Sequence, residues 1–473
     1  MRYLFQIIIA SLLIVSCQIE DENAPAPDET YVKYYGELTS YEASDIEIIY
    51  DATGEVAEGL IVFGTKLTEN GDTDYFILRT DLQGNLVDSI SFGYSDTLDI
   101  QPFGSPDGLA DDWTGDGVKD RFRADEFAGQ IQPINGFGYA IIGSSSITIN
   151  ALGVSDWRWL TFGFLDLDLE PIRFLNDTLL ARISDSGDQL DMVGNDIILL
   201  SSGGFLLAGG QEFDRGGGDT DFDNYFMKLN FDDGIVFESN QGISGEGEDD
   251  ILVRVFEKSN GNLVMIGSSN TPSLLGENAG VNGVNVFYLE TDENGTPVNS
   301  AAYGIDNVNN NVVYNDQVNN AIRLSSGFGI VGTSSTSQNQ RFGFIMNLSN
   351  NGIYLSGNSH DSSLYNTESV TLQNTGRGIV QAPDNDLVML GQYTSFTSGT
   401  NSRGGEGMFV KFDQASNPVE GAESFFGLSD GNDNIVDAVT LPDGKIVAVA
   451  NVDFGGGVKL ISIIKLNSDG SLD

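Results

Sequence analysis

Seven short apolar runs, each ending in a small residue, recur along the chain. Their apolar residues occupy successive positions rather than alternating ones, which predicts strands that are buried on both faces. We expect these strands near the centre of the fold, where a terminal Gly or Ala permits close backbone approach. The runs are LIVFG (60–64), YAIIG (139–143), FLLAG (205–209), LVMIG (263–267), FGIVG (328–332), LVMLG (387–391) and IVAVA (446–450).

A second strand ending in a polar turn follows each run, and segments typical of a third and a fourth strand complete each period. Examples are 74–84 for the second strand, 297–304 for the third and 250–256 for the fourth. The small residues that end successive runs are 79, 66, 58, 65, 59 and 59 residues apart. Four short strands in a recurring period of this size predict an all-β, seven-bladed β-propeller with four antiparallel strands per blade.

The two ends of the chain supply complementary parts of one blade. The chain ends directly after the seventh second strand, while 31–36 matches a third strand and 45–50 a fourth. We therefore predict that N- and C-terminal strands together close the last blade, which removes the open sheet edge. The propeller is assigned to 31–473.

The second strands share the pattern D-x-D-[FY]-x-x-K-[LF]-[DN]-x-x-G. It is most complete at 221–234 and 74–84. This pattern resembles the propeller repeats of bacterial extracellular lipoproteins. The resemblance implies the fold; it does not imply an activity, because such repeats host unrelated functions.

The N-terminus has the features of a bacterial export signal. Residues 1–16 combine Arg2 with a short apolar stretch, and Ile14-Val15-Ser16-Cys17 resembles a lipobox, in which Cys17 is lipidated. The acidic residues 18–22 resemble the export signal of surface-exposed lipoproteins in Bacteroidota, and 17–30 reads as a flexible tether. We expect a lipid-anchored protein of the outer membrane, exposed at the cell surface; an ordinary signal peptide is the alternative.

Charge and composition exclude several functional classes. The chain has 22 Lys and Arg against 69 Asp and Glu, a net charge of −47, which disfavours nucleic acid as a partner. A single cysteine and a single histidine (His360) exclude a disulfide framework, a Cys–His nucleophilic pair and a multi-histidine zinc site. A carboxylate pair for glycoside chemistry stays open, because the acidic residues offer many combinations.

An Asp-rich insertion at 106–126 is the candidate metal site. It resembles the calcium loops of EF-hand and thrombospondin type 3 repeats, although Thr replaces Asp at the third position and Arg123 replaces Glu at the twelfth. Asp125 or Glu126 would then supply the bidentate ligand, and any calcium would be structural. A solvated Asp–Gly turn is the alternative. The candidate ligands are Asp112, Thr114, Asp116, Val118 and Asp120.

Two further features bear on partners. Trp157 and Trp159 lie two apart, so on a strand they share one face and would either stack on a sugar or fill a gap between blades. The long connections 271–285 and 395–406 are candidate contact sites. The leading interpretation is a non-enzymatic interaction module or accessory subunit of an outer-membrane complex. A glycan-binding lipoprotein for nutrient capture or adhesion is the alternative, and a polysaccharide-active enzyme is third.

Overall fold

The described part of the protein consists of strands joined by turns and loops. In this computed structural model none of the described residues forms a helix with the length and hydrophobicity of a membrane span. The residues that the structure describes are 29–37, 39–93, 123–149, 154–173, 179–180, 182–183, 189–214, 220–230, 235–240, 250–269, 284–305, 314–336, 341–359, 370–397, 405–427 and 431–472.

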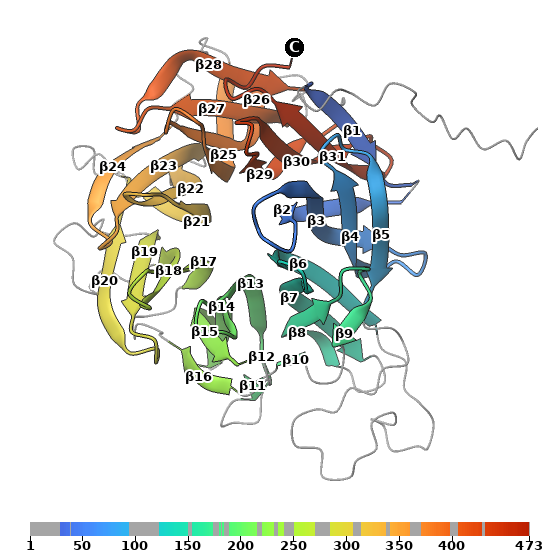
Figure 1. Ribbon diagram of the computed structural model, residues 1–473, viewed down its shortest axis with the longest axis vertical. Helices are drawn as coiled ribbons and strands as arrows, with labels where there is room; N and C mark the ends of the chain where they lie inside the picture. The colour runs from blue at the N-terminus through green and yellow to red at the C-terminus, as the bar shows by residue number, and fades with distance from the viewer. Residues whose placement is uncertain are drawn as a thin grey trace, which may run out of the picture.

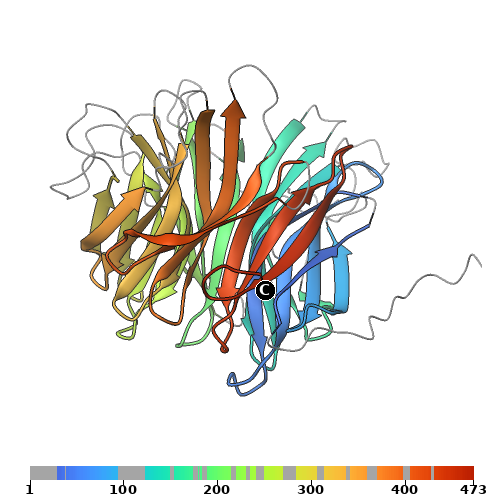
Figure 2. The same ribbon diagram turned by 90° about the horizontal axis from the view of Figure 1, so that it is seen from above.

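Seven antiparallel sheets stand around one axis and form a closed ring (Figure 1). In the edge-on view of Figure 2 the strands run between two faces of this ring. We call the face where the innermost strands begin the upper face, and the face where they end the lower face. The protein is therefore a seven-bladed β-propeller with four strands per blade, which confirms the predicted fold class.

Each blade takes its four strands in chain order, except the last. Blade 2 has an additional short strand, β10 (Leu179–Leu180), and β11 (Arg182–Ile183) pairs with β12 (Gln189–Leu190) beside it. From the axis outward, the blades are as follows: blade 1, β2 (Tyr41–Tyr50), β3 (Ala57–Leu67), β4 (Thr73–Asp81), β5 (Leu86–Phe92); blade 2, β6 (Arg123–Ile134), β7 (Gly138–Ile149), β8 (Val154–Leu165), β9 (Pro171–Arg173); blade 3, β13 (Met192–Leu199), β14 (Phe205–Asp214), β15 (Thr220–Leu229), β16 (Ile235–Asn240); blade 4, β17 (Ile251–Glu257), β18 (Leu263–Ser269), β19 (Asn285–Thr291), β20 (Pro297–Tyr303); blade 5, β21 (Tyr314–Arg323), β22 (Gly327–Thr336), β23 (Arg341–Ser349), β24 (Tyr354–Ser359); blade 6, β25 (Val370–Gln381), β26 (Leu387–Thr397), β27 (Glu406–Phe412), β28 (Pro418–Phe426); blade 7, β29 (Asn434–Thr440), β30 (Ile446–Asp453), β31 (Lys459–Leu466), β1 (Tyr31–Tyr35).

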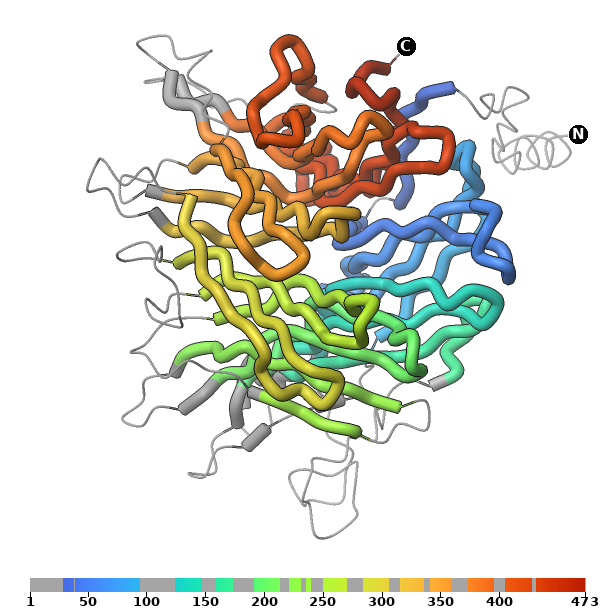
Figure 3. The backbone as a smooth tube through the Cα atoms, turned by 60° about the vertical axis from the view of Figure 1, so that its left-hand side comes forward, coloured from blue at the N-terminus to red at the C-terminus, as the bar shows by residue number. Residues whose placement is uncertain are grey.

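Blade 7 joins the two ends of the chain, as predicted. Its outermost strand β1 pairs with β31, with Lys33 opposite Ile463, so the first and the last described strands are neighbours (Figure 3). The assignment of 45–50 to this blade was wrong. Those residues belong to β2, which pairs with β3 and is the innermost strand of blade 1. The fourth strand of each sequence period thus pairs with the apolar run that follows it.

The apolar runs were also expected closer to the axis than they lie. Each forms the second strand of its blade, and a more polar strand separates it from the axis. The expectation of two-sided burial is confirmed, since Leu263 to Ser269 of β18 are all buried. Among the described residues the core is divided into seven hydrophobic clusters, each between two neighbouring blades. No blade could bury both faces without its neighbours.

The polar signature of the repeat links successive blades. The cation near the end of the third strand donates a hydrogen bond to a backbone carbonyl in a turn of the next blade: Lys228 Nζ reaches Glu293 O at 3.2 Å, and Lys465 Nζ reaches Leu82 O at 3.5 Å. In blade 5 Asn347 Nδ2 takes this role toward Gln414 O at 3.4 Å. The pattern that identified the repeat therefore has a structural function.

Candidate functional site: the central channel

Every innermost strand has a β-bulge at the same level, opposite the small residue that ends the apolar run. In blade 3, for example, Gly209 pairs with Gly194 directly before the bulge. A Cβ at Gly209 would lie 1.8 Å from Val193 O, which explains the small residue. The register shifts lie between Ala43/Asp45, Ala128/Ile131, Gly194/Asp196, Leu252/Arg254, Val318/Asn320, Gly376/Gly378 and Ile435/Asp437.

The residue that follows each bulge forms a layer at the centre of the channel, because a bulge redirects the side chains beside it. In blade 2 the member of this layer is Gln130, which lies within the register shift between Ala128 and Ile131. We call this layer the central ring. Most of its members are polar, although they come from innermost strands whose neighbouring positions are largely apolar. The central ring consists of Asp45, Gln130, Asp196, Arg254, Asn320, Gly378 and Asp437.

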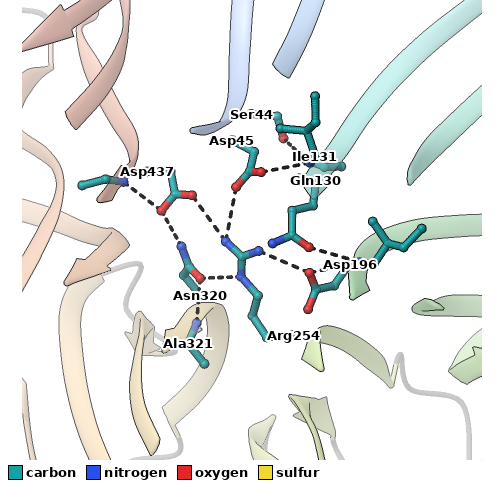
Figure 4. A network of polar contacts seen from close by, with 12 residues as sticks. Ser44, Asp45, Gln130, Ile131, Asp196, Arg254, Asn320, Ala321 and Asp437 are labelled. Carbon is teal, nitrogen blue, oxygen red and sulfur yellow. Dashed lines mark hydrogen bonds and ion pairs between the residues drawn. The ribbon is translucent and has the colours of Figure 1, made fainter. Parts of the chain in front are cut away.

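Arg254 of β17 lies in the middle of this ring (Figure 4). Its guanidinium forms ion pairs with Asp45 of blade 1 at 3.5 Å, with Asp196 of blade 3 at 3.3 Å and with Asp437 of blade 7 at 3.3 Å. Its Nε donates to Asn320 Oδ1 at 2.6 Å. One side chain from blade 4 thus connects four other blades across the axis.

Three side-chain oxygens of the ring accept hydrogen bonds from the backbone of the next blade. Asp45 Oδ2 accepts from Ile131 N at 3.0 Å, and Asp196 Oδ2 accepts from Val255 N at 2.5 Å. Gln130 Oε1 accepts from Ile197 N at 3.1 Å in the same way. These bonds join blade 1 to blade 2, blade 2 to blade 3 and blade 3 to blade 4.

Three aspartates around one guanidinium leave an excess of negative charge. Acidic groups in the channel therefore have raised pKa values. Burial raises the pKa of Asp196 to about 6 although Arg254 opposes the shift. Burial raises the pKa of Asp437 well above its ordinary range, and a hydrogen bond with Asp45 favours its protonated form. Burial and the nearby Asp45 likewise raise the pKa of Glu47, one layer below the ring, to about 8. The ring therefore carries less negative charge at neutral pH than its sequence suggests.

Two pockets lie along the channel, one toward each face. The lower pocket, of about 430 Å³, has the central ring on one side and walls formed by the layer below it. In the layer directly below the ring, Glu47 and Gln132 are polar in blades 1 and 2, while the residues from the other five blades are apolar. Those apolar residues are Ile198, Phe256, Ile322, Val380 and Val439.

The upper pocket, of about 500 Å³, has a different lining. Its walls carry amides, hydroxyls and the partly exposed ring of Phe127. The guanidinium of Arg158 stacks on this ring, with its Cζ 4.6 Å from the ring centroid. Glu42 and Lys459 form an ion pair at this pocket. Arg377 also lines the upper pocket. Its guanidinium forms no hydrogen bond or ion pair with the described residues.

The residues singled out from the sequence lie away from this channel or outside the described residues. Asp112, Thr114, Asp116, Val118 and Asp120 lie outside them, as do Cys17 and His360. Arg123, Asp125 and Glu126 belong to β6, where Asp125 Oδ1 accepts from Thr73 N at 3.2 Å. Within the described ranges no three histidine, cysteine or acidic side chains gather as ligands of one metal ion.

The two tryptophans occupy β8. Trp159 is 3% exposed, which agrees with the interpretation that it fills space inside the protein and makes it unsuited as a surface platform. Trp157 pairs with Ile147 in the sheet, and its side chain is outside the described part of the structure. Most of 271–285 and 395–406 also lies outside the described residues, so their role in partner contact stays a prediction.

The similarity of this chain to known proteins is weak. No family model and no curated protein matches the sequence. Among solved structures, a protein of unknown function from Dyadobacter fermentans is 14% identical, with a TM-score of 0.40 over 93% of this chain and 97% of that chain. A periplasmic gluconolactonase from Pseudomonas aeruginosa is 10% identical, with a TM-score of 0.44 over 83% and 87% of the two chains. A polysaccharide lyase that acts on ulvan is 10% identical, with a TM-score of 0.45 over 92% and 96%. Similarity this low gives no information on activity.

Proposed function

We propose that the protein is a non-enzymatic binding module, carried on the outer membrane by a lipid anchor at Cys17 and exposed at the cell surface. One observation carries the proposal: the side chains of the central ring are engaged in holding the blades together, which leaves the upper pocket as a preformed recess. The acid at this pocket, Glu42, is ion-paired with Lys459. Among the described residues of the pocket there is no nucleophile with an adjacent general base.

The proposed lipid anchor and the proposed location at the cell surface are inferred from the sequence. The lipobox at 14–17 and the acidic residues 18–22 support surface display in the manner of Bacteroidota lipoproteins. The closed propeller would present the upper face to an outer-membrane protein complex or to an extracellular ligand. The insertion at 106–126 would bind calcium in a structural role.

A glycan-binding protein is the second candidate. The amides and the partly exposed Phe127 in the upper pocket favour it, because hydroxyl-rich ligands take both hydrogen bonds and contact with an aromatic face. In this version the ligand site is the upper pocket and not the tryptophan pair.

Cross-linked affinity purification of the full-length lipoprotein from native outer membranes tests the proposal. Recovery of a stoichiometric outer-membrane protein would support an accessory subunit. Recovery of the protein alone would contradict that role and favour the glycan-binding candidate. Protease added to intact cells tests the location at the cell surface. We expect the protein to be digested, and full protection of the protein would contradict surface exposure.

A further inference from the structure

Arg377 is a cation in the channel that has no anionic partner among the described residues. It is the bulge residue of β25, between the two positions where the register shifts, and it lines the upper pocket. Arg377 is exposed to solvent within the pocket, and partial desolvation by the pocket walls lowers the pKa of its guanidinium. Within the described residues no carboxylate compensates for this loss of hydration, although the chain has 69 acidic residues.

In three other blades the equivalent residue is polar and bonds to the next blade. Ser44 Oγ donates to Ala128 O at 2.8 Å, Asn195 Nδ2 to Leu252 O at 2.7 Å, and Asn319 Nδ2 to Gly376 O at 2.6 Å. Each bond reaches the backbone of the next blade. Arg377 makes no such bond within the described residues, so its side chain has no visible role in joining the blades.

The backbone that carries Arg377 is tightly fixed. A Cβ at Gly376 would lie 2.5 Å from a methyl carbon of Val331, and a Cβ at Gly378 would lie 3.0 Å from Asp437 Cα. Both flanking positions therefore pack against neighbouring blades. A fixed attachment point reduces the entropy that the guanidinium loses when it binds a ligand.

The groups around Arg377 in the upper pocket are suited to hydroxyls. Asn434 lines the pocket with its side-chain amide, whose buried Oδ1 accepts no hydrogen bond within the described residues. Thr65 adds a hydroxyl. Phe127 is 44% exposed, and the part of its ring that Arg158 does not cover adds an apolar surface for the C–H face of a sugar ring. The volume of about 500 Å³ is within the usual range of small-molecule sites.

We propose that the upper pocket binds a short carboxylated saccharide and that Arg377 is the residue that holds its carboxylate. A guanidinium matches a carboxylate with two parallel hydrogen bonds, which a neutral sugar cannot offer. The net charge of −47 repels dense polyanions, so a saccharide with few carboxylates fits better than an extended one. This inference rests on the proposed binding function and names its ligand class.

Isothermal titration calorimetry with two matched probes tests the inference. Digalacturonic acid carries the carboxylates, and its dimethyl ester keeps the ring shape without the charge. We expect the wild-type protein to bind the acid about tenfold or more tightly than the ester, because a charge-assisted bidentate pair contributes at least this factor. Arg377→Gln should lose about the same factor for the acid and leave binding of the ester within about twofold. Arg377→Lys, which keeps the charge without the planar fork, should fall between the two.

Arg323→Gln is the matched control, because Arg323 is an exposed arginine that lines the lower pocket. It should bind both probes as the wild type does, and circular dichroism should confirm that each variant is folded. Equal affinity for acid and ester, an unchanged affinity in Arg377→Gln, or no binding of either probe by the wild type would overturn the inference. Tighter binding of a tripeptide through its free C-terminal carboxylate would overturn the saccharide as ligand.

The same experiment separates this inference from the proposed function. Chromatography of the probe after long incubation reports cleavage. Cleaved digalacturonic acid would contradict the non-enzymatic proposal and leave the assignment of Arg377 standing. Absence of binding together with a partner recovered by cross-linking would overturn the inference alone.

Discussion

Two arginines occupy successive layers of one channel and differ in what surrounds them. Arg254 lies among three aspartates and an asparagine from four other blades. Arg377, one layer above, lines a polar pocket and makes no ion pair within the described residues. The same side chain at nearly the same level therefore serves two purposes. The paired arginine holds the blades together, and the unpaired arginine remains available to a ligand.

The largest effect is expected when the paired arginine is removed. Arg254→Met leaves Asp45, Asp196 and Asp437 without a cation, so the free energy of unfolding at pH 7.5 should fall by about 3–5 kcal/mol. At pH 5 the loss should be smaller, because Asp196, with a pKa of about 6, then carries a proton. Chemical denaturation at the two pH values measures both. Arg323→Met removes an exposed arginine as a control, and an equal loss in both variants would contradict a specific role of Arg254.

Relief of the excess negative charge below the ring should stabilise the protein. Glu47 binds its proton more tightly in the folded protein, where its pKa is about 8, than in the unfolded chain, where it is near 4.5. The contribution of protonated Glu47 to the free energy of unfolding is therefore fully present below pH 4.5 and is lost as the pH rises through 8. Glu47→Gln should raise the free energy of unfolding at pH 8.5 by about 2 kcal/mol and change it little at pH 4.5. The exposed Glu55→Gln is the control; a similar gain there would show a general effect of net charge.

A carboxylate introduced beside Arg377 should form an ion pair with it, as the aspartates do with Arg254, and should compete with the ligand. Val436 is the bulge residue of the neighbouring blade 7 and also lines the upper pocket. In Val436→Glu the new carboxylate would pair with Arg377 and lower the affinity for digalacturonic acid about tenfold. Val436→Gln has nearly the same size without the charge and should keep more of the affinity. Equal affinities of these two variants would show that Arg377 does not hold the ligand's carboxylate.

The smallest effect is expected on stability when Arg377 itself is replaced. Arg377→Met removes no hydrogen bond or ion pair within the described residues, so the free energy of unfolding should stay within about 0.5 kcal/mol of the wild type. Thermal unfolding without ligand measures this change. A loss of more than about 2 kcal/mol would place Arg377 among the structural residues.

The repeat could be read from the sequence because its physical cause is local. Each terminal Gly is required by a bulge that follows from the strand pairing, as at Gly209, and each polar turn recurs with its blade. The ring could not be read in this way, since Asp45, Arg254 and Asp437 meet only when the propeller closes. A signal for it exists nevertheless. Asp196, Arg254 and Asp437 each lie 13 residues before the small residue of their repeat and are charged in an otherwise largely apolar strand.

The pocket was harder to predict than the ring. Arg377 is one cation in the segment TGRG, and nothing in the sequence shows that uncharged amides such as Asn434 and Asn319 line the same pocket. These amides come from blades 5 and 7, which flank blade 6. The tryptophans were conspicuous in the sequence for a different reason, since large side chains such as Trp159 also fill the space between blades.

Thermal unfolding of the wild type, Arg254→Met and Arg377→Met, each with and without digalacturonic acid, tests the central claim most directly. We predict a lower melting temperature for Arg254→Met, and an unchanged one for Arg377→Met in the absence of ligand. The acid should raise the melting temperature of the wild type and have no effect on Arg377→Met. Equal destabilisation by the two substitutions, or a full ligand response in Arg377→Met, would contradict the division of roles between the two arginines.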